Sequence, residues 1–278
     1  MAVDYIINLP CEPKLAFGTG DLLQGTGAIL ELLKARNRAA AIVEIAKAKG
    51  KSPSEISVTV RVLTPDGIEQ QQSVTHGTLV EQCQPLAAHA AACRNCPGNS
   101  LQTEYGCYGA LNYPVPASAE RWLFAKLQPP SHVGGNLFLQ SVKQFDNRGT
   151  EVERMRAAGL FESKLPFTTT HRISFFNRPT FTSSQLIEAI LGVGESLDTW
   201  HCGGILLWLG AIQIDGVVPV EPRHVNDFLS LQTVADRQSR TSFCVEEPLD
   251  HTGESAFYHV LKALYTAWVL GVPILVSP

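Results

Sequence analysis

The sequence predicts an α+β protein, with mixed sheets, packed helices and a cysteine-ligated structural metal site in its N-terminal half. Segments with the strand period of two alternate along the chain with segments whose apolar residues recur at helical spacing. Apolar residues make up 45% of the chain and charged residues 17%. This composition is typical of a protein with a large apolar core, whereas disordered chains have fewer apolar and more charged residues. Three cysteines fall close together, at positions 93, 96 and 107.

The N-terminal half is expected to begin with a short strand over residues 4–8. Pro10 and Pro13 then restrict the backbone of the following loop, because each proline fixes its own φ and limits the residue before it. Residues 27–49 predict a helix, since their apolar side chains recur at helical spacing. The polar run 34–38 is a candidate break between two shorter helices.

A β-hairpin is expected next. Residues 56–63 alternate between apolar and polar side chains, and residues 68–74 return as a more polar strand after the turn at 65–67. A helix capped by Thr78 follows, and Pro85 is expected to interrupt or bend it because proline lacks the backbone N–H that a helix interior uses.

The C-terminal half continues with mixed elements. A capping box formed by Thr150 and Glu153 predicts where one of its helices starts. Residues 201–214 are apolar and contain glycine, so they predict either a buried strand or a buried helix, and residues 221–240 predict a more polar helical region. The other predicted helices span 117–127, 136–145, 151–158, 185–191 and 253–270, and the predicted strands span 169–176 and 272–276.

The best candidate for a domain boundary is the run of prolines and glycines at residues 128–135. It divides the chain into an N-terminal α+β domain, residues 1–130, which contains the cysteine cluster, and a C-terminal α+β domain, residues 131–278. The alternative is that both parts form one continuous unit.

Charge and targeting signals narrow the class of protein. A net charge of -4 and a pI near 6.1, with no cluster of lysine and arginine, argue against a nucleic-acid partner. The first residues lack a basic start and a long apolar run, and the most apolar stretch, 263–276, is too short to cross a bilayer as a helix. We therefore expect a cytoplasmic protein without a membrane partner, whose seven cysteines are not a disulfide framework.

The cluster Cys93-x-x-Cys96 with Cys107 has the spacing of a metal-binding turn. A structural zinc site takes a tetrahedral set of thiolate or imidazole ligands, so a fourth ligand must come from elsewhere. Cys11 is favoured because it lies between two prolines in a constrained loop, while Cys83 and His89 stay open as alternatives. The expected zinc ligands are therefore Cys11, Cys93, Cys96 and Cys107, with an iron–sulfur cluster on the same ligands less favoured.

Other residues could carry chemistry but are better explained by packing. The pair His201-Cys202 could act as a nucleophile and base only if the side chains meet, and a small buried residue entering an apolar segment is the favoured interpretation. Glu104 is the one acidic side chain within the cysteine cluster, and a solvated loop carboxylate explains it. The strand residues 172–178 place two arginines around aromatic side chains, a pattern that could accept an extended peptide at a sheet edge.

The segments Leu9–Pro13, Cys93-x-x-Cys96-Pro97 and Gly106–Gly109 together resemble a bacterial family of undetermined activity with a CxxCP…GCYG pattern. In size and general composition the chain is also similar to the peptide-binding proteins of crocagin-type ribosomal peptide (RiPP) biosynthesis. That resemblance implies a non-catalytic protein, with a homodimer among its expected states, that holds a precursor peptide for modifying enzymes. The expected function is a zinc-stapled peptide- or protein-binding module, and the alternative is a zinc-dependent hydrolase or a cysteine-nucleophile transferase.

Overall fold

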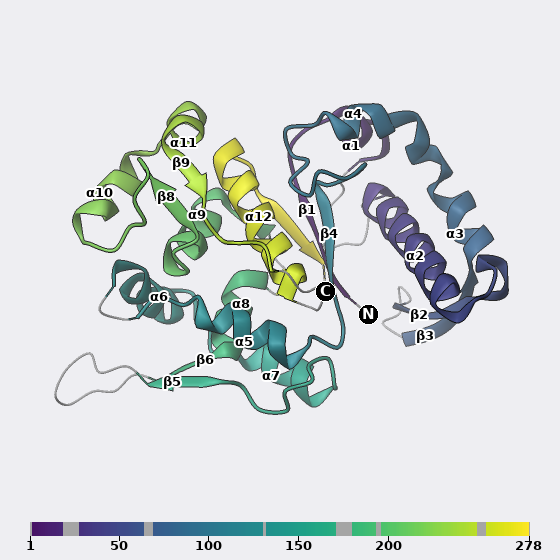
Figure 1. Ribbon diagram of the computed structural model, residues 1–278, viewed down its shortest axis with the longest axis horizontal. Helices are drawn as coiled ribbons and strands as arrows, with labels where there is room; N and C mark the ends of the chain where they lie inside the picture. Colours follow the sequence, from purple (N-terminus) through teal and green to yellow (C-terminus); the bar gives the residue numbers. More distant parts are fainter. Residues whose placement is uncertain are drawn as a thin grey trace. The chain divides into compact units, whose positions relative to one another are not determined.

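The computed structural model confirms a mixed α+β protein (Figure 1). Contacts divide the chain into two compact units, one comprising Pro10–Tyr108 and the other Ala2–Leu9 with Gly109–Pro278. Among the residues that the structure describes, no helix is long and apolar enough to cross a membrane. The described residues are 2–18, 28–63, 69–129, 132–170, 180–192, 196–248 and 254–277.

The first unit is a long helix, a hairpin and a chain of short helices. Helix α2 packs against α3, and their contact surface is a cluster of buried apolar side chains with the hairpin residues Val58 and Val74 at its edge. In chain order the elements are α1 (Glu12–Phe17), α2 (Ala28–Lys49), η2 (Pro53–Glu55), β2 (Ser57–Leu63), β3 (Glu69–Thr75), α3 (His76–Cys83), η3 (Gln84–His89) and α4 (Ala90–Arg94).

The hairpin is confirmed, but two details of the predicted helices are wrong. Helix α2 runs without a break through residues 34–38, because Ala35 and Ala39 are buried in the apolar cluster on one face of the helix. The cap of α3 is Thr75, whose hydroxyl accepts a hydrogen bond from the Thr78 backbone N–H at 3.4 Å. Pro85 does end the α-helix, since the chain continues from Cys83 as the 3-10 helix η3.

The second unit is built around a four-stranded sheet in the order β4-β1-β10-β7. Strand β1 (Ala2–Ile7) pairs antiparallel with β10 (Ile274–Ser277), so the two ends of the chain form neighbouring strands (Figure 1). The remaining strands are β4 (Tyr108–Asn112), β7 (Ser196–Leu197), the pair β5 (Thr168–Thr170) and β6 (Thr180–Thr182), and the pair β8 (Ile212–Ile214) and β9 (Thr241–Phe243).

This arrangement differs from the boundary at residue 130 that the sequence predicts. The first strand belongs to the second unit, because its ladder partner β10 lies at the other end of the chain. The first unit is therefore an insertion, which the chain enters after Leu9 and leaves at Tyr108.

The helices of the second unit enclose a large apolar core. Helix α12 packs against α9 and α5, and α9 also packs against α6. Phe138, Phe257 and Trp268 are among the largest fully buried side chains. The helices are α5 (Ala117–Ala125), α6 (Val133–Gln144), α7 (Thr150–Ala157), α8 (Ser183–Leu191), α9 (Thr199–Trp208), α10 (Arg223–Ser230), α11 (Val234–Arg240) and α12 (Glu254–Leu270).

Three sequence predictions in this unit can be compared with the observed elements. The apolar run 201–214 is mostly helix, α9, and ends as the short strand β8. The capping box predicted for α7 is wrong, because Gly149 is the N-cap and the carboxylate of Glu188 accepts the Gly149 and Glu151 backbone N–H groups. Of the predicted strand 169–176, only Thr169 and Thr170 lie within the described residues, in β5.

The proposed peptide-accepting edge at 172–178 and the hairpin turn at 65–67 lie outside the described residues, so they stay predictions.

Candidate metal centre and neighbouring pocket

The four predicted zinc ligands all belong to the first unit. Cys93 lies in α4, Cys96 lies in the turn that follows it, and Cys107 directly precedes β4. The sequence predicts a loop around Cys11, whereas in the structure Cys11 is the N-cap residue of the short helix α1. All four are free thiols, of which Cys93 and Cys107 are buried and Cys11 and Cys96 are half-buried.

Electrostatic coupling places these four thiols within range of one another. Burial, together with the nearby thiols of Cys107, Cys11 and Cys96, raises the pKa of Cys93 to about 11. Burial likewise raises the pKa of Cys107 to about 11, with Cys96 and Cys11 adding to the rise. The predicted ligands, which come from three separate segments of the chain, therefore lie close enough together to shift the pKa of Cys93 and Cys107.

A buried lysine accompanies the cluster. Lys14, in α1, is only 4% exposed, and its charge lowers the pKa of both Cys93 and Cys107. An ammonium group so far from water is stable only beside groups that compensate its charge. Sequence reasoning missed this residue, because a lysine three positions after Cys11 in a short helix has the pattern of an ordinary solvated side chain.

The two alternative fourth ligands are engaged elsewhere. Cys83 packs against the apolar cluster of the first unit, and its thiol donates to the Val80 carbonyl at 3.5 Å. His89 Nδ1 lies 3.3 Å from Glu12 Oε1, and its ring meets Phe17 edge-on. These contacts favour Cys11.

In the part of the chain that the structure describes, no three histidine, cysteine, aspartate or glutamate side chains are arranged so that they could hold a metal ion. The four thiols are thus neighbours rather than a formed coordination shell. Their chemistry still matches that of a tetrahedral thiolate site, for which zinc is the usual ion.

The loop that carries the cluster has a well-defined backbone. The Cys96 N–H donates to the Cys93 carbonyl at 3.3 Å, and the Ser100 hydroxyl donates to the Gly106 carbonyl at 3.0 Å. Gly106 is required here, because a β-carbon at this position would overlap the side chain of Asn99. The two arms of the loop are therefore held close together before any ion binds.

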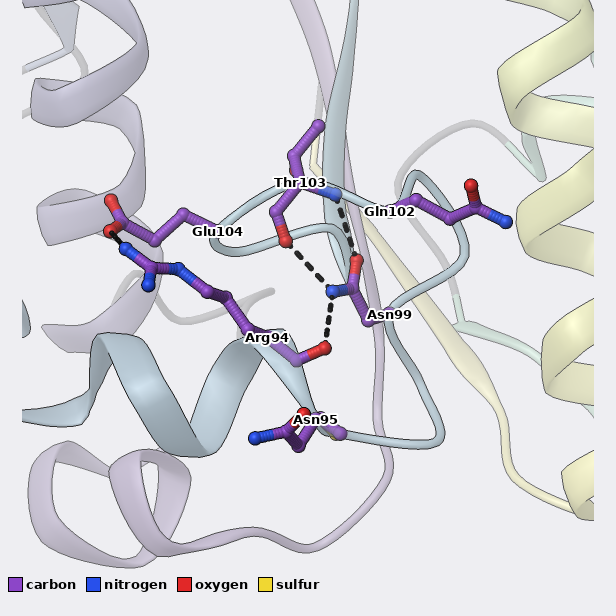
Figure 2. A pocket seen from close by; sticks show the side chains of 7 residues that line it. Arg94, Asn95, Asn99, Gln102, Thr103 and Glu104 are labelled. Atoms are coloured by element: carbon purple, nitrogen blue, oxygen red, sulfur yellow. Dashed lines mark hydrogen bonds and ion pairs between the residues drawn. The ribbon is translucent and has the colours of Figure 1, made fainter.

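An open pocket that sequence reasoning missed adjoins this loop (Figure 2). Its volume is about 410 Å³. Glu104, expected to be a solvated carboxylate, instead accepts hydrogen bonds from Arg94 and Arg36, which lower its pKa. The lining residues are Arg94, Asn95, Cys96, Asn99, Gln102, Thr103 and Glu104.

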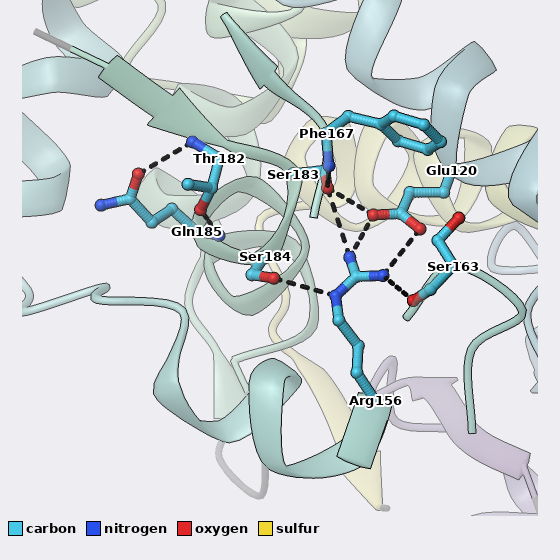
Figure 3. A network of polar contacts seen from close by, with 8 residues as sticks. All are labelled: Glu120, Arg156, Ser163, Phe167, Thr182, Ser183, Ser184 and Gln185. Atoms are coloured by element: carbon cyan, nitrogen blue, oxygen red, sulfur yellow. Dashed lines mark hydrogen bonds and ion pairs between the residues drawn. The ribbon is translucent and has the colours of Figure 1, made fainter. Parts of the chain in front are cut away.

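The second unit contains a buried ion pair between Glu120 and Arg156, also missed from the sequence (Figure 3). The Arg156 guanidinium additionally donates to the Ser163 carbonyl at 2.9 Å and to the Ser184 hydroxyl at 3.0 Å. Ser183 donates to Glu120 and accepts from the Phe167 N–H. Because its charges are compensated and its hydrogen bonds are satisfied, this network acts as a structural centre.

The pair His201-Cys202 does not have the geometry of a nucleophile and its base. Cys202 is completely buried, and burial raises its pKa well above the ordinary range of a thiol. His201 Nε2 lies 3.1 Å from the Ala189 carbonyl oxygen. A thiol that stays protonated is a poor nucleophile, so these contacts favour the packing role.

No family model matches this chain, and neither a curated protein nor a solved structure matches it. The geometry of the two units is therefore the basis of the functional argument that follows.

Proposed function

We propose that the chain is a non-catalytic, zinc-stapled module that binds a peptide or protein partner. The observation that carries the proposal is the grouping of four free thiols, from three separate segments, around Cys93. Zinc would be held by Cys11, Cys93, Cys96 and Cys107, and it would supply structural cross-links rather than an activated water.

Charge supports this assignment. Zinc with four thiolates carries a net negative charge, which is costly to bury without a compensating cation. Lys14, buried and close enough to affect two of the thiols, provides that cation. Because the thiols must lose their protons when zinc binds, the affinity for zinc should rise with pH.

The position of the ligands supports a structural role. Cys11 and Cys107 lie at the two ends of the inserted unit, Pro10–Tyr108. A cross-link that closes a loop of this length removes much conformational freedom from the unfolded chain, and the analogous term for a disulfide is roughly 4–5 kcal/mol. A zinc cross-link would therefore add to the stability that the apolar cluster of this unit provides.

The binding role is supported by the neighbouring polar pocket, which lies on the same loop as two of the thiols. A partner peptide in ribosomal peptide biosynthesis is the occupant that the sequence resemblance suggests. The module would hold this peptide for modifying enzymes, without itself reacting.

Metal analysis of the purified full chain, together with cysteine variants, tests the zinc site. We expect one zinc per chain, retained in Cys83→Ser and in His89→Ala but lost in Cys11→Ser and Cys93→Ser. Zinc retained in Cys11→Ser but lost in Cys83→Ser or His89→Ala would contradict the assignment of the fourth ligand. If the chain contains iron in place of zinc and shows the visible absorption of an iron–sulfur cluster, the assignment of zinc is wrong.

Peptide titration tests the binding role separately. The probes are peptides encoded beside the gene, titrated against the zinc-loaded chain by calorimetry, with light scattering to detect the expected homodimer. Saturable binding without turnover supports the proposal. Chemical conversion of the bound peptide by the chain alone would support the hydrolase or transferase alternative and overturn it.

A further inference from the structure

The pocket beside the cysteine loop is lined by Arg94 and Glu104, and Arg36, which is not part of the lining, shares the Glu104 carboxylate. Glu104 accepts hydrogen bonds from two guanidinium groups, Arg94 at 2.7 Å and Arg36 at 2.9 Å, so one carboxylate faces two cations. The Arg36 guanidinium also lies over the Tyr105 ring at 4.6 Å from its centre. Arg94 is the freer of the two arginines, because its side chain is 64% exposed and lines the pocket.

The floor of the pocket is rigid. Asn99 uses its whole carboxamide to hold the loop, donating to the carbonyls of Arg94 at 3.0 Å and Thr103 at 2.8 Å and accepting from the Thr103 N–H at 3.2 Å (Figure 2). The groups around Asn99 are therefore fixed before a ligand arrives, which reduces the entropy lost on binding.

Gln102, another residue of the lining, has an unusual backbone conformation. Its φ of 53° lies in the left-handed region, which side chains other than glycine rarely adopt. Strained residues of this kind concentrate at ligand sites. Gln102 is exposed and lines the pocket, and Figure 2 shows Gln102 and Arg94 extending to opposite sides of Asn99.

We infer that this pocket binds an acidic peptide segment. Arg94 would receive a carboxylate, since a guanidinium offers several N–H donors in a planar fork. Gln102 and Asn95 would pair with the peptide backbone, because a carboxamide matches the donor and acceptor of a peptide group. This inference rests on the proposed peptide-binding function and names the site and the chemistry of its ligand.

Size and charge favour a peptide over other anions. The volume of about 410 Å³ falls within the range of about 300–1,000 Å³ typical of small-ligand sites, so it suits a short stretch of chain. A nucleic acid needs an extended basic surface, whereas this pocket is lined by a single arginine, Arg94, in a chain of net charge -4.

The test uses nuclear magnetic resonance on the zinc-loaded full chain, following the side-chain signals of Arg94 and Gln102. The probes are the capped hexapeptide Gly-Ser-Asp-Glu-Ser-Gly, its uncharged match Gly-Ser-Asn-Gln-Ser-Gly, free succinate and a single-stranded oligonucleotide. We expect saturable shifts of both signals with the acidic peptide and a much weaker response to the other three probes.

Variants locate the site. Arg94→Gln should lower the affinity for the acidic peptide by roughly tenfold or more, which is the usual effect of losing a charge-assisted hydrogen bond. Gln102→Gly should lower this affinity less. The thermal unfolding temperature should stay unchanged or rise in this variant, because glycine adopts a positive φ freely. The matched control is Arg148→Gln, which removes an exposed arginine paired with Asp146 in the second unit and should leave binding unchanged.

Three results would overturn the inference. These are equal binding of the acidic and uncharged peptides, binding of succinate or the oligonucleotide as tight as that of the peptide, and unchanged affinity in Arg94→Gln. If peptides encoded beside the gene bind the chain but Arg94→Gln has no effect on them, this site is wrong while the proposed function stands. If no peptide binds at all, the proposed function itself fails.

Discussion

The two units hold their buried charges in opposite ways. In the second unit, Glu120 and Arg156 neutralise each other, and three serines complete their hydrogen bonds (Figure 3). In the first unit, the buried ammonium group of Lys14 lies close enough to the cysteine cluster to lower the pKa of Cys93 and Cys107. The buried charges of the second unit thus compensate each other within the chain, whereas in the first unit the proposed zinc site would be the partner of the buried cation.

The two units also differ in the size of the apolar side chains that they bury. The second unit buries large aromatic side chains such as Phe138, Phe257 and Trp268. The buried cluster between the helices of the first unit consists of three alanines together with Ile42, Ile56 and Leu79. Since hydrophobic stabilisation scales with buried apolar area, each residue of this cluster contributes less than the aromatic residues buried in the second unit.

The largest expected effect is that of zinc removal. A strong chelator at neutral pH should abolish hydrogen-exchange protection in α2 of the first unit and leave α12 of the second protected, because structural zinc contributes roughly 10–16 kcal/mol in small metal-dependent folds. Exchange measured by mass spectrometry resolves the two helices. Equal loss of protection in both would show that the units do not differ in this way.

The second effect concerns the buried ion pair. Arg156→Met leaves Glu120 buried without its cation, so the free energy of unfolding of the second unit should fall by about 3–5 kcal/mol. Denaturant unfolding measures it. Arg148→Met breaks the exposed pair with Asp146 and is the control, with an expected change of about 0–1 kcal/mol. Similar losses in both variants would mean that the buried network is not a structural centre.

The third effect compares neighbouring glycines in α9. A β-carbon at Gly203 would lie 2.5 Å from Trp268 Nε1, whereas at Gly204 it would meet Trp208 only at 3.9 Å. We expect Gly203→Ala to destabilise the second unit by about 1–3 kcal/mol through overpacking. Gly204→Ala should stabilise it by about 0.5–1 kcal/mol, because alanine favours a helix. Thermal unfolding of both variants decides the order, and a Gly203→Ala variant as stable as the parent would contradict the tight packing.

The smallest effect is the pH response of the pocket. Hydrogen bonds from Arg94 and Arg36 lower the pKa of Glu104, so the unfolded chain binds this proton at a higher pH than the folded chain does. The stabilisation is therefore complete above the unfolded pKa of about 4.3 and is lost as the pH falls through the folded value. Carboxyl titration followed by magnetic resonance measures this pKa, which should return toward its ordinary value in Arg94→Gln.

The local elements of this protein could be predicted from short stretches of its sequence. Alternation over residues 56–63 predicted the hairpin strand β2, apolar spacing predicted α2 and α12, and the spacing of Cys93, Cys96 and Cys107 predicted the cysteine loop. Each of these signals arises from residues near one another in the chain, where backbone geometry fixes the spacing of side chains.

The contacts between residues far apart in the chain could not be predicted and follow from the folded structure. It placed Cys11 and Lys14 beside the cysteine loop, joined Glu104 to Arg36, and gave the N-terminal strand β1 a partner at the other end of the chain. No local pattern encodes such contacts, because they depend on how whole elements pack and on which buried charges must be compensated there.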